Sequence, residues 1–190
     1  MIKIVELFNN PANFKREYEG CWSFIVEGIP YLFFAKSIRS YTSEKYEENI
    51  FFSYVEYLKN KKYNTDNIIS IDYFKKDIYE ITFMEEIPAQ NQRYKDYSCE
   101  ITGKGNAPIV FSTVIDILKD FISEKNPITF YFFAKEKSRI KLYDIFYKIS
   151  KRFFPDYSVL SSTMFNGERF YFFTSGENLI EFLLSKKKIS

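Results

Sequence analysis

The sequence predicts an α/β (α+β) domain with a mostly antiparallel central sheet flanked by helices. Three observations carry this prediction: segments of alternating polarity between turn residues, several helical patterns with an apolar stripe, and a high aromatic content. Of the 190 residues, 46% are hydrophobic and 21% are aromatic, which is enough to form a sizeable core. We expect one domain over residues 1–190, because no linker-like change in composition divides the chain.

The sequence is organised around residues 97–154, which predict a strand, a glycine turn, an apolar helix, a strand and a second helix. Pro108 suits the first turn of a helix, where its missing N–H has no intrahelical use. Apolar residues from there to Ile122 cover most of the helix surface. Because a helix with this pattern is buried on more than one face, we expect Pro108–Ile122 to be among the most buried segments.

The N-terminal residues predict a strand pair, a helix and two further strands. In order, the expected elements are strands at Trp22–Val26 and Tyr31–Ala35 around a turn at Glu27–Pro30, an amphipathic helix at Glu44–Lys61, strands at Asn67–Tyr73 and Ile78–Met84, and a loop at Glu85–Asp96. The alternation is weak in Ile78–Met84, where both faces have some apolar character.

The C-terminal residues predict a buried strand, a helix and a hairpin. Ile128–Ala134 is nearly all apolar, which is typical of a strand covered on both faces. In the helix expected at Ser138–Arg152, the core-facing residues should be Leu142, Ile145, Phe146, Ile149 and Phe153. Asn166-Gly167 favours a tight turn that pairs Tyr157–Phe165 with Arg169–Thr174. A last helix is expected from about Ser175.

Several classes of site are excluded by composition. The chain has no histidine, so it contains neither a Ser-His-Asp triad nor a Cys-His pair nor a His-ligated zinc site. A magnesium site built from carboxylates alone stays open, although no tight acidic cluster indicates a metal. Cys21 and Cys99 have no metal or redox spacing, and we expect both to be buried free thiols.

The net charge of +2 is too balanced to indicate nucleic-acid binding by itself. The helix around 135–152 nevertheless carries many basic residues. They could attract a phosphate-bearing cofactor, an acidic protein or a nucleic acid, or they could simply form a solvated helix face. No signal-peptide pattern is evident, and no run of 18 apolar residues indicates a membrane span.

The order of elements over residues 78–174 resembles the cofactor-binding half of the acetyltransferase (GNAT) fold, a three-layer domain. The stretch ITGKGNA…VFSTVIDILKDFI…SRIKLYD is also similar to a group of uncharacterised bacteriophage proteins expected to have this fold. Residues 1–77 are a divergent N-terminal part without such a resemblance, and residues 175–190 are expected to form a C-terminal helix. The resemblance implies a protein in the cytoplasm of an infected bacterial host or in a phage virion.

The resemblance also implies site residues. The turn occupies the place of the family's pyrophosphate loop, where backbone N–H groups and a helix N-terminus bind the phosphates of coenzyme A. The implied cofactor-binding residues are Gly103, Lys104, Gly105, Asn106 and Ala107. Tyr143 follows Leu142 as in the family's Leu-Tyr pair, whose tyrosine acts as general acid. Glu85 and Glu80 lie where the fold has its general base.

These residues suggest two main functions and a third hypothesis. The first is a non-catalytic protein of acetyltransferase-like fold that acts through protein–protein interaction and needs no cofactor. Its support is the aromatic content and Glu100, which replaces the Gln or Arg usual three positions before the first glycine and would repel a pyrophosphate. The alternative is an acyl-CoA-dependent N-acetyltransferase that uses acetyl-CoA. Nucleic-acid binding through the basic helix is a third hypothesis.

Overall fold

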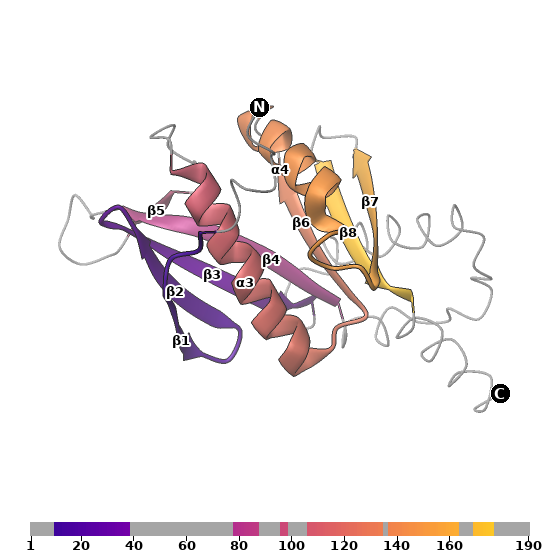
Figure 1. Cartoon of the computed structure of the whole chain (residues 1–190), viewed down its shortest axis with the longest axis horizontal. Helices are drawn as coiled ribbons and strands as arrows, with labels where there is room; N and C mark the ends of the chain where they lie inside the picture. The colour runs from indigo at the N-terminus through magenta and orange to yellow at the C-terminus, as the bar shows by residue number, and fades with distance from the viewer. Residues whose placement is uncertain are drawn as a thin grey trace. The chain divides into compact units, whose positions relative to one another are not determined.

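The structure is a computed structural model that describes residues 10–38, 78–87, 96–98, 106–134, 137–163 and 169–176, and its fold is mixed α/β (Figure 1). The chain divides into two compact units. The first comprises residues 1–35 and 81–126, and the second comprises residues 36–80 and 127–190. Each unit contains strands and one of the two described helices.

In the first unit the strands follow the order β1-β2-β3-β4, with β5 paired to the end of β4. Their bounds are β1 Phe14–Tyr18, β2 Cys21–Val26, β3 Ile29–Ser37, β4 Ile78–Ile87 and β5 Asp96–Ser98. The β1–β2, β2–β3 and β4–β5 pairs are antiparallel. The expected strands at residues 22–26 and 31–35 are therefore confirmed.

Two sequence predictions in this unit were wrong in their bounds. The turn after β2 contains only Glu27 and Gly28, because Val26 already pairs with Ile29 and Pro30 lies inside β3. Positive φ angles of 51° and 79° at the two turn residues are those of the two-residue turn that matches strand twist. The polar segment expected as a loop at Glu85–Asp96 begins with the last residues of β4 and ends with the first residue of β5.

Helix α3, Ala107–Lys125, confirms the predicted apolar helix and covers one face of the β1–β4 strands (Figure 1). Its buried residues are Val110, Phe111, Ser112, Thr113, Val114, Ile115, Ile117, Leu118 and Phe121. The helix ends at Asn126, which adopts a left-handed conformation with φ 44° and donates its N–H to the Ile122 carbonyl. Such a burial pattern leaves little of α3 to solvent, as its composition predicts.

Trp22 connects this helix to the sheet. Its indole Nε1 donates to Asp120 Oδ2 at 3.0 Å, and its ring lies edge-on to Phe33 and Phe121 at centroid distances of 5.5 and 6.3 Å. The Arg16 guanidinium lies 5.6 Å from the centre of the same ring and pairs with Glu124 of the helix. These contacts therefore identify which face of β1, β2 and β3 packs against α3.

Gly20, in the turn between β1 and β2, is expected to tolerate no side chain. Its φ is +74°, and a Cβ there would lie 2.6 Å from the Ala35 carbonyl oxygen, which is backbone. We expect Gly20→Ala to lower the free energy of unfolding by about 2 kcal/mol or more, since it combines left-handed strain with a clash. Gly28→Asn is the control, because φ is +79° there, nothing lies within 4 Å, and Asn tolerates this conformation. Urea titrations in which both variants lose equal stability would contradict the steric argument.

In the second unit the strand order is β4-β6-β8-β7. Residues 78–80 of β4 pair in parallel with β6, whereas β6–β8 and β7–β8 are antiparallel. The other bounds are β6 Thr129–Ala134, α4 Lys137–Ser150, β7 Tyr157–Thr163 and β8 Arg169–Ser175. The predicted strand 128–134 and the helix near 138–152 are confirmed. The predicted pairing of Tyr157–Phe165 with Arg169–Thr174 is confirmed for residues 157–163, and residues 164–165 lie outside the described residues.

The core of this unit is an aromatic cluster between α4 and the sheet. Phe130, Phe132 and Phe173 point to this side, where Phe146 of α4 lies 5.6 Å from Phe132 and 5.7 Å from Phe173. The predicted core face of α4 was partly wrong, because Ile145 is 41% exposed. Tyr143 is buried instead.

Other predictions lie outside the described residues. They are the helix 44–61, the strand 67–73, Cys99, the Gly103–Gly105 turn and the Asn166-Gly167 turn. The last helix was predicted from about Ser175, but Ser175 is the final residue of β8, and the rest of that prediction after residue 176 lies outside the described residues. The described chain adds one strand that the sequence did not predict. This is β1, whose five residues are all exposed.

Candidate functional site

Tyr143, the implied general acid, lies on α4 and is 6% exposed. Its ring contacts Phe132 of β6 at 5.7 Å and Tyr171 of β8 at 5.8 Å between centroids. Next to it, Asp144 accepts hydrogen bonds from the Tyr171 hydroxyl at 2.9 Å and from Arg169 at 3.2 Å. Tyr143 is thus part of the aromatic core of the second unit.

Glu80, one implied general base, is buried in the same unit. Its carboxylate accepts a hydrogen bond from the Tyr131 hydroxyl at 2.8 Å, and the two residues are register partners across the parallel β4–β6 pair. Both side chains therefore lie on one face of the sheet.

The structure does not bring Glu80 and Tyr143 together. Tyr143 contacts Phe132, and Glu80 contacts Tyr131, which is the adjacent residue of β6. Because neighbouring side chains of a strand point to opposite faces, the two candidates lie on opposite sides of the sheet. They cannot act as base and acid on one bound molecule in this arrangement.

Glu85, the other implied base, lies on β4 in the first unit, near the start of α3. Asn106 is the N-cap of α3, is 1% exposed, and donates from Nδ2 to the Tyr31 hydroxyl at 3.4 Å. Its Oδ1 has no hydrogen-bond partner in the described part of the chain. Burial raises the pKa of Tyr31, the Asn106 hydrogen bond opposes this, and the Glu85 carboxylate raises it further. Ala107 is the first residue of α3.

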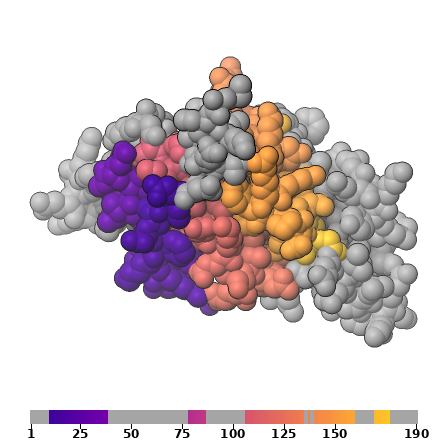
Figure 2. Space-filling model, viewed as in Figure 1, coloured from indigo at the N-terminus to yellow at the C-terminus, as the bar shows by residue number. Residues whose placement is uncertain are grey.

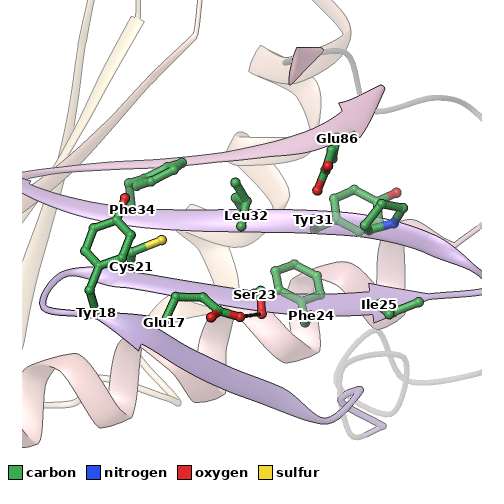
Figure 3. A pocket seen from close by; sticks show the side chains of 11 residues that line it. Glu17, Tyr18, Cys21, Ser23, Phe24, Ile25, Tyr31, Leu32, Phe34 and Glu86 are labelled. Atoms are coloured by element: carbon green, nitrogen blue, oxygen red, sulfur yellow. Dashed lines mark hydrogen bonds between the residues drawn. The ribbon is translucent and has the colours of Figure 1, made fainter. Parts of the chain in front are cut away.

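A surface groove of about 620 Å³ lies in the first unit and was not predicted from the sequence. We call it the outer groove, and Figure 3 shows the side chains around it. It is lined by Glu17, Tyr18, Cys21, Ser23, Phe24, Ile25, Pro30, Tyr31, Leu32, Phe34 and Glu86. Cys21, Ser23 and Ile25 alternate with the α3-facing side chains of β2, so most of the lining belongs to the opposite sheet face.

Large apolar side chains border the outer groove. Tyr18 is 62% exposed and Ile25 is 63% exposed. Ile25 also borders a second hollow of about 470 Å³ that includes Phe14 and Lys15. The β1 and β2 atoms, coloured indigo, also reach the surface on the side of the molecule drawn in Figure 2. Exposed apolar side chains beside concave surface are typical of interaction sites.

The polar groups of the outer groove include Glu17, Ser23 and the Cys21 thiol. Ser23 donates to Glu17 Oε1 at 2.5 Å, drawn as a dashed line in Figure 3, and Lys15 contacts Glu17 Oε2 at 3.0 Å. These two hydrogen bonds hold the pKa of Glu17 below its ordinary value. Burial raises the pKa of Cys21, against the lowering effect of the Tyr18 hydrogen bond. The thiol is therefore a poor nucleophile at neutral pH.

No family model matches the chain, and comparisons with curated proteins and with solved structures also give no match. Among the described residues no three potential metal-ligating side chains gather. No helix in the described part of the chain is long and apolar enough to cross a membrane. The candidate site therefore has to be interpreted from its own geometry, which combines apolar walls with carboxylates.

Proposed function

We propose that this chain has an acetyltransferase-like fold and acts by binding a partner protein, not by catalysis. The observation that carries the proposal is the outer groove with its exposed border of Tyr18 and Ile25. Aromatic and aliphatic side chains of this kind, left in water on the isolated chain, supply the central contacts of protein interfaces. In keeping with the resemblance to bacteriophage proteins, we propose a partner in the infected bacterial cell or in the virion.

The element order supports the fold part of the proposal. A strand, helix α3, strand β6, helix α4 and the β7–β8 pair follow one another as in the cofactor half of the GNAT fold, and β4 and β6 are parallel. The absence of catalysis is supported by the placement of Glu80 and Tyr143 on opposite faces of the sheet. It is also supported by the burial of the Tyr143 ring in an aromatic cluster.

Site-specific photo-crosslinking tests the proposal. A benzophenone amino acid at position 25 should give a discrete covalent adduct in infected cells, and the adduct can be identified by mass spectrometry. Position 145 is the matched control, because Ile145 is also an exposed isoleucine but lies on α4 in the second unit. Adducts at 145 and none at 25 would contradict the proposal.

The alternative function, acyl-CoA-dependent N-acetyl transfer, is favoured by one observation. Asn106 is buried at the N-terminus of α3 with an unpartnered Oδ1 in the described part of the chain, beside Tyr31 and near Glu85. Helix N-termini attract phosphate groups, and a buried orphan acceptor can bind a donor such as an amide or amine. The same end of α3 follows the turn that resembles the pyrophosphate loop.

Calorimetric titration with acetyl-CoA at low salt distinguishes the two functions. We expect weak or no binding by the wild type, because Glu100 replaces the usual Gln or Arg, and a carboxylate about 4 Å from a pyrophosphate repels it by about 1–4 kcal/mol, depending on the effective dielectric. Glu100→Gln should then strengthen binding. Micromolar or tighter binding by the wild type that is lost in Gly105→Glu would instead establish the cofactor site and overturn the non-catalytic proposal.

A further inference from the structure

The outer groove combines apolar walls with negative charge. Among the described residues that line it, the charged ones are Glu17 on β1 and Glu86 on β4, and none is a lysine or an arginine. We infer that it receives a segment of the partner protein in which a lysine or arginine lies next to an apolar side chain. This inference rests on the proposed function, because it specifies the chemistry of the same partner.

The Glu17 carboxylate is already oriented by hydrogen bonds in a way that suits binding of a cation. Its two carboxylate oxygens are fixed from one side by the Ser23 hydroxyl and from the other by the Lys15 ammonium. Both hydrogen bonds favour the ionised form, so the group carries a full negative charge at neutral pH. A carboxylate that is already oriented loses little freedom when it binds a ligand.

The Lys15 contact shows that the carboxylate accepts an ammonium group. The Lys15 side chain is 75% exposed, and an ion pair in this position contributes little to stability. An incoming lysine or arginine can therefore share Glu17 with Lys15 or displace it at small cost.

Other nearby cations are turned away from the groove. Arg16 lies between Lys15 and Glu17 in sequence, but its guanidinium pairs with Glu124 and lies over the Trp22 ring on the α3 side. Lys125 likewise pairs with Glu124 and with Glu19. Arg16 and Lys125 thus pair with carboxylates outside the groove, and Lys15 is the described cation that contacts Glu17 of the groove.

The apolar part of the groove favours an apolar side chain next to the lysine or arginine of the partner segment. Leu32, Phe34 and Ile25 lie on the same sheet face as Ser23, within two register positions of it. A hollow of about 620 Å³ has room for several side chains, as in typical binding pockets. The Tyr18 ring, 62% exposed, also offers a face on which a cation can stack. These features favour a basic and apolar peptide segment over a purely acidic or purely polar one.

Selection from a random twelve-residue peptide library on the full chain tests the inference. Peptides that also bind Ile25→Asn are removed, so that the survivors are specific for the groove. We expect lysine or arginine beside an aliphatic or aromatic residue in the surviving sequences. Survivors without basic residues, or no survivors at all, would overturn the inference.

The affinity of one selected peptide, followed by fluorescence anisotropy, gives the matched comparison. Glu17→Gln should weaken binding by about threefold to tenfold, and more at low salt than at high salt. Glu124→Gln changes the net charge equally, but its residue lies on α3 on the other side of the sheet, so binding should be unchanged. Equal loss in both variants would overturn the inference.

The inference and the proposed function can fail separately. A protein captured at position 25 whose binding is unaffected by Glu17→Gln would leave the proposed function standing and overturn this account of the partner's chemistry. If position 25 captures nothing while selected basic peptides still require Glu17, the groove binds small basic peptides and the protein-partner proposal falls.

Discussion

Phe173→Ala is expected to lower the free energy of unfolding by about 3–5 kcal/mol, the usual cost of removing a fully buried aromatic side chain. Phe173 on β8 is 0% exposed and stacks on Phe130 with 4.7 Å between ring centroids. Phe146 of α4 and Phe154 contact it from 5.7 and 6.3 Å. Alanine would leave a cavity that these rigid rings cannot fill by small shifts.

The control for this prediction is Ile145→Ala on α4. Ile145 belongs to the same unit but is 41% exposed, so its truncation should cost less than about 1 kcal/mol. Guanidinium titrations followed by circular dichroism measure both variants. If Phe173→Ala costs no more than Ile145→Ala, the aromatic cluster is not the core of the second unit.

Trp22→Ala is expected to have a comparable effect in the first unit, about 3–5 kcal/mol. The side chain is 1% exposed and contacts Phe33 and Phe121, and its Nε1 donates to Asp120. Removing it therefore deletes the ring contact with Phe121 and the hydrogen bond to Asp120 that connect β2 to α3. Hydrogen exchange of the α3 backbone amides reports the loss in this unit specifically.

Trp22→Phe is the matched variant for this second prediction. It keeps most of the ring contacts and removes the hydrogen bond to Asp120, which should cost only about 1–2 kcal/mol. The backbone amides of α3 should thus be clearly better protected from hydrogen exchange in Trp22→Phe than in Trp22→Ala. Similar protection in both would mean that ring packing on Phe121 contributes little.

The elements that the sequence predicted correctly are those with a strong local pattern. Pro108 and the apolar run after it are sufficient for α3, because they require no knowledge of the partner surface. The apolar run of β6 and the Asn166-Gly167 dipeptide likewise predict a buried strand and a β7–β8 pairing. In each case the residues that predict the element lie within that element or directly beside it in the sequence.

The elements that were wrong or missed depend on distant residues. Ile145 has the right spacing for the core face of α4, but the helix turns Tyr143 toward Phe132 and Tyr171 instead. β1 has five exposed residues at the edge of the described sheet, so no hydrophobic alternation indicates it.

The outer groove could not be predicted because its lining combines residues 17–34 with Glu86 of a later strand. One local feature does point to it. Ile25 lies between the buried Phe24 and Val26, so the alternation of β2 places it on the side of Cys21 and Ser23, where it contributes an exposed apolar side chain to the groove.

Binding of the partner captured at position 25 to purified variants tests the central claim most directly. Ile25→Asn should weaken the complex by about tenfold or more in calorimetric titration, since an amide in the middle of an apolar contact is left without hydrogen-bond partners. Ile145→Asn, the same substitution at an exposed residue of α4, should leave the affinity unchanged. Equal affinity of the two variants for the partner would contradict the claim that this chain acts through the outer groove.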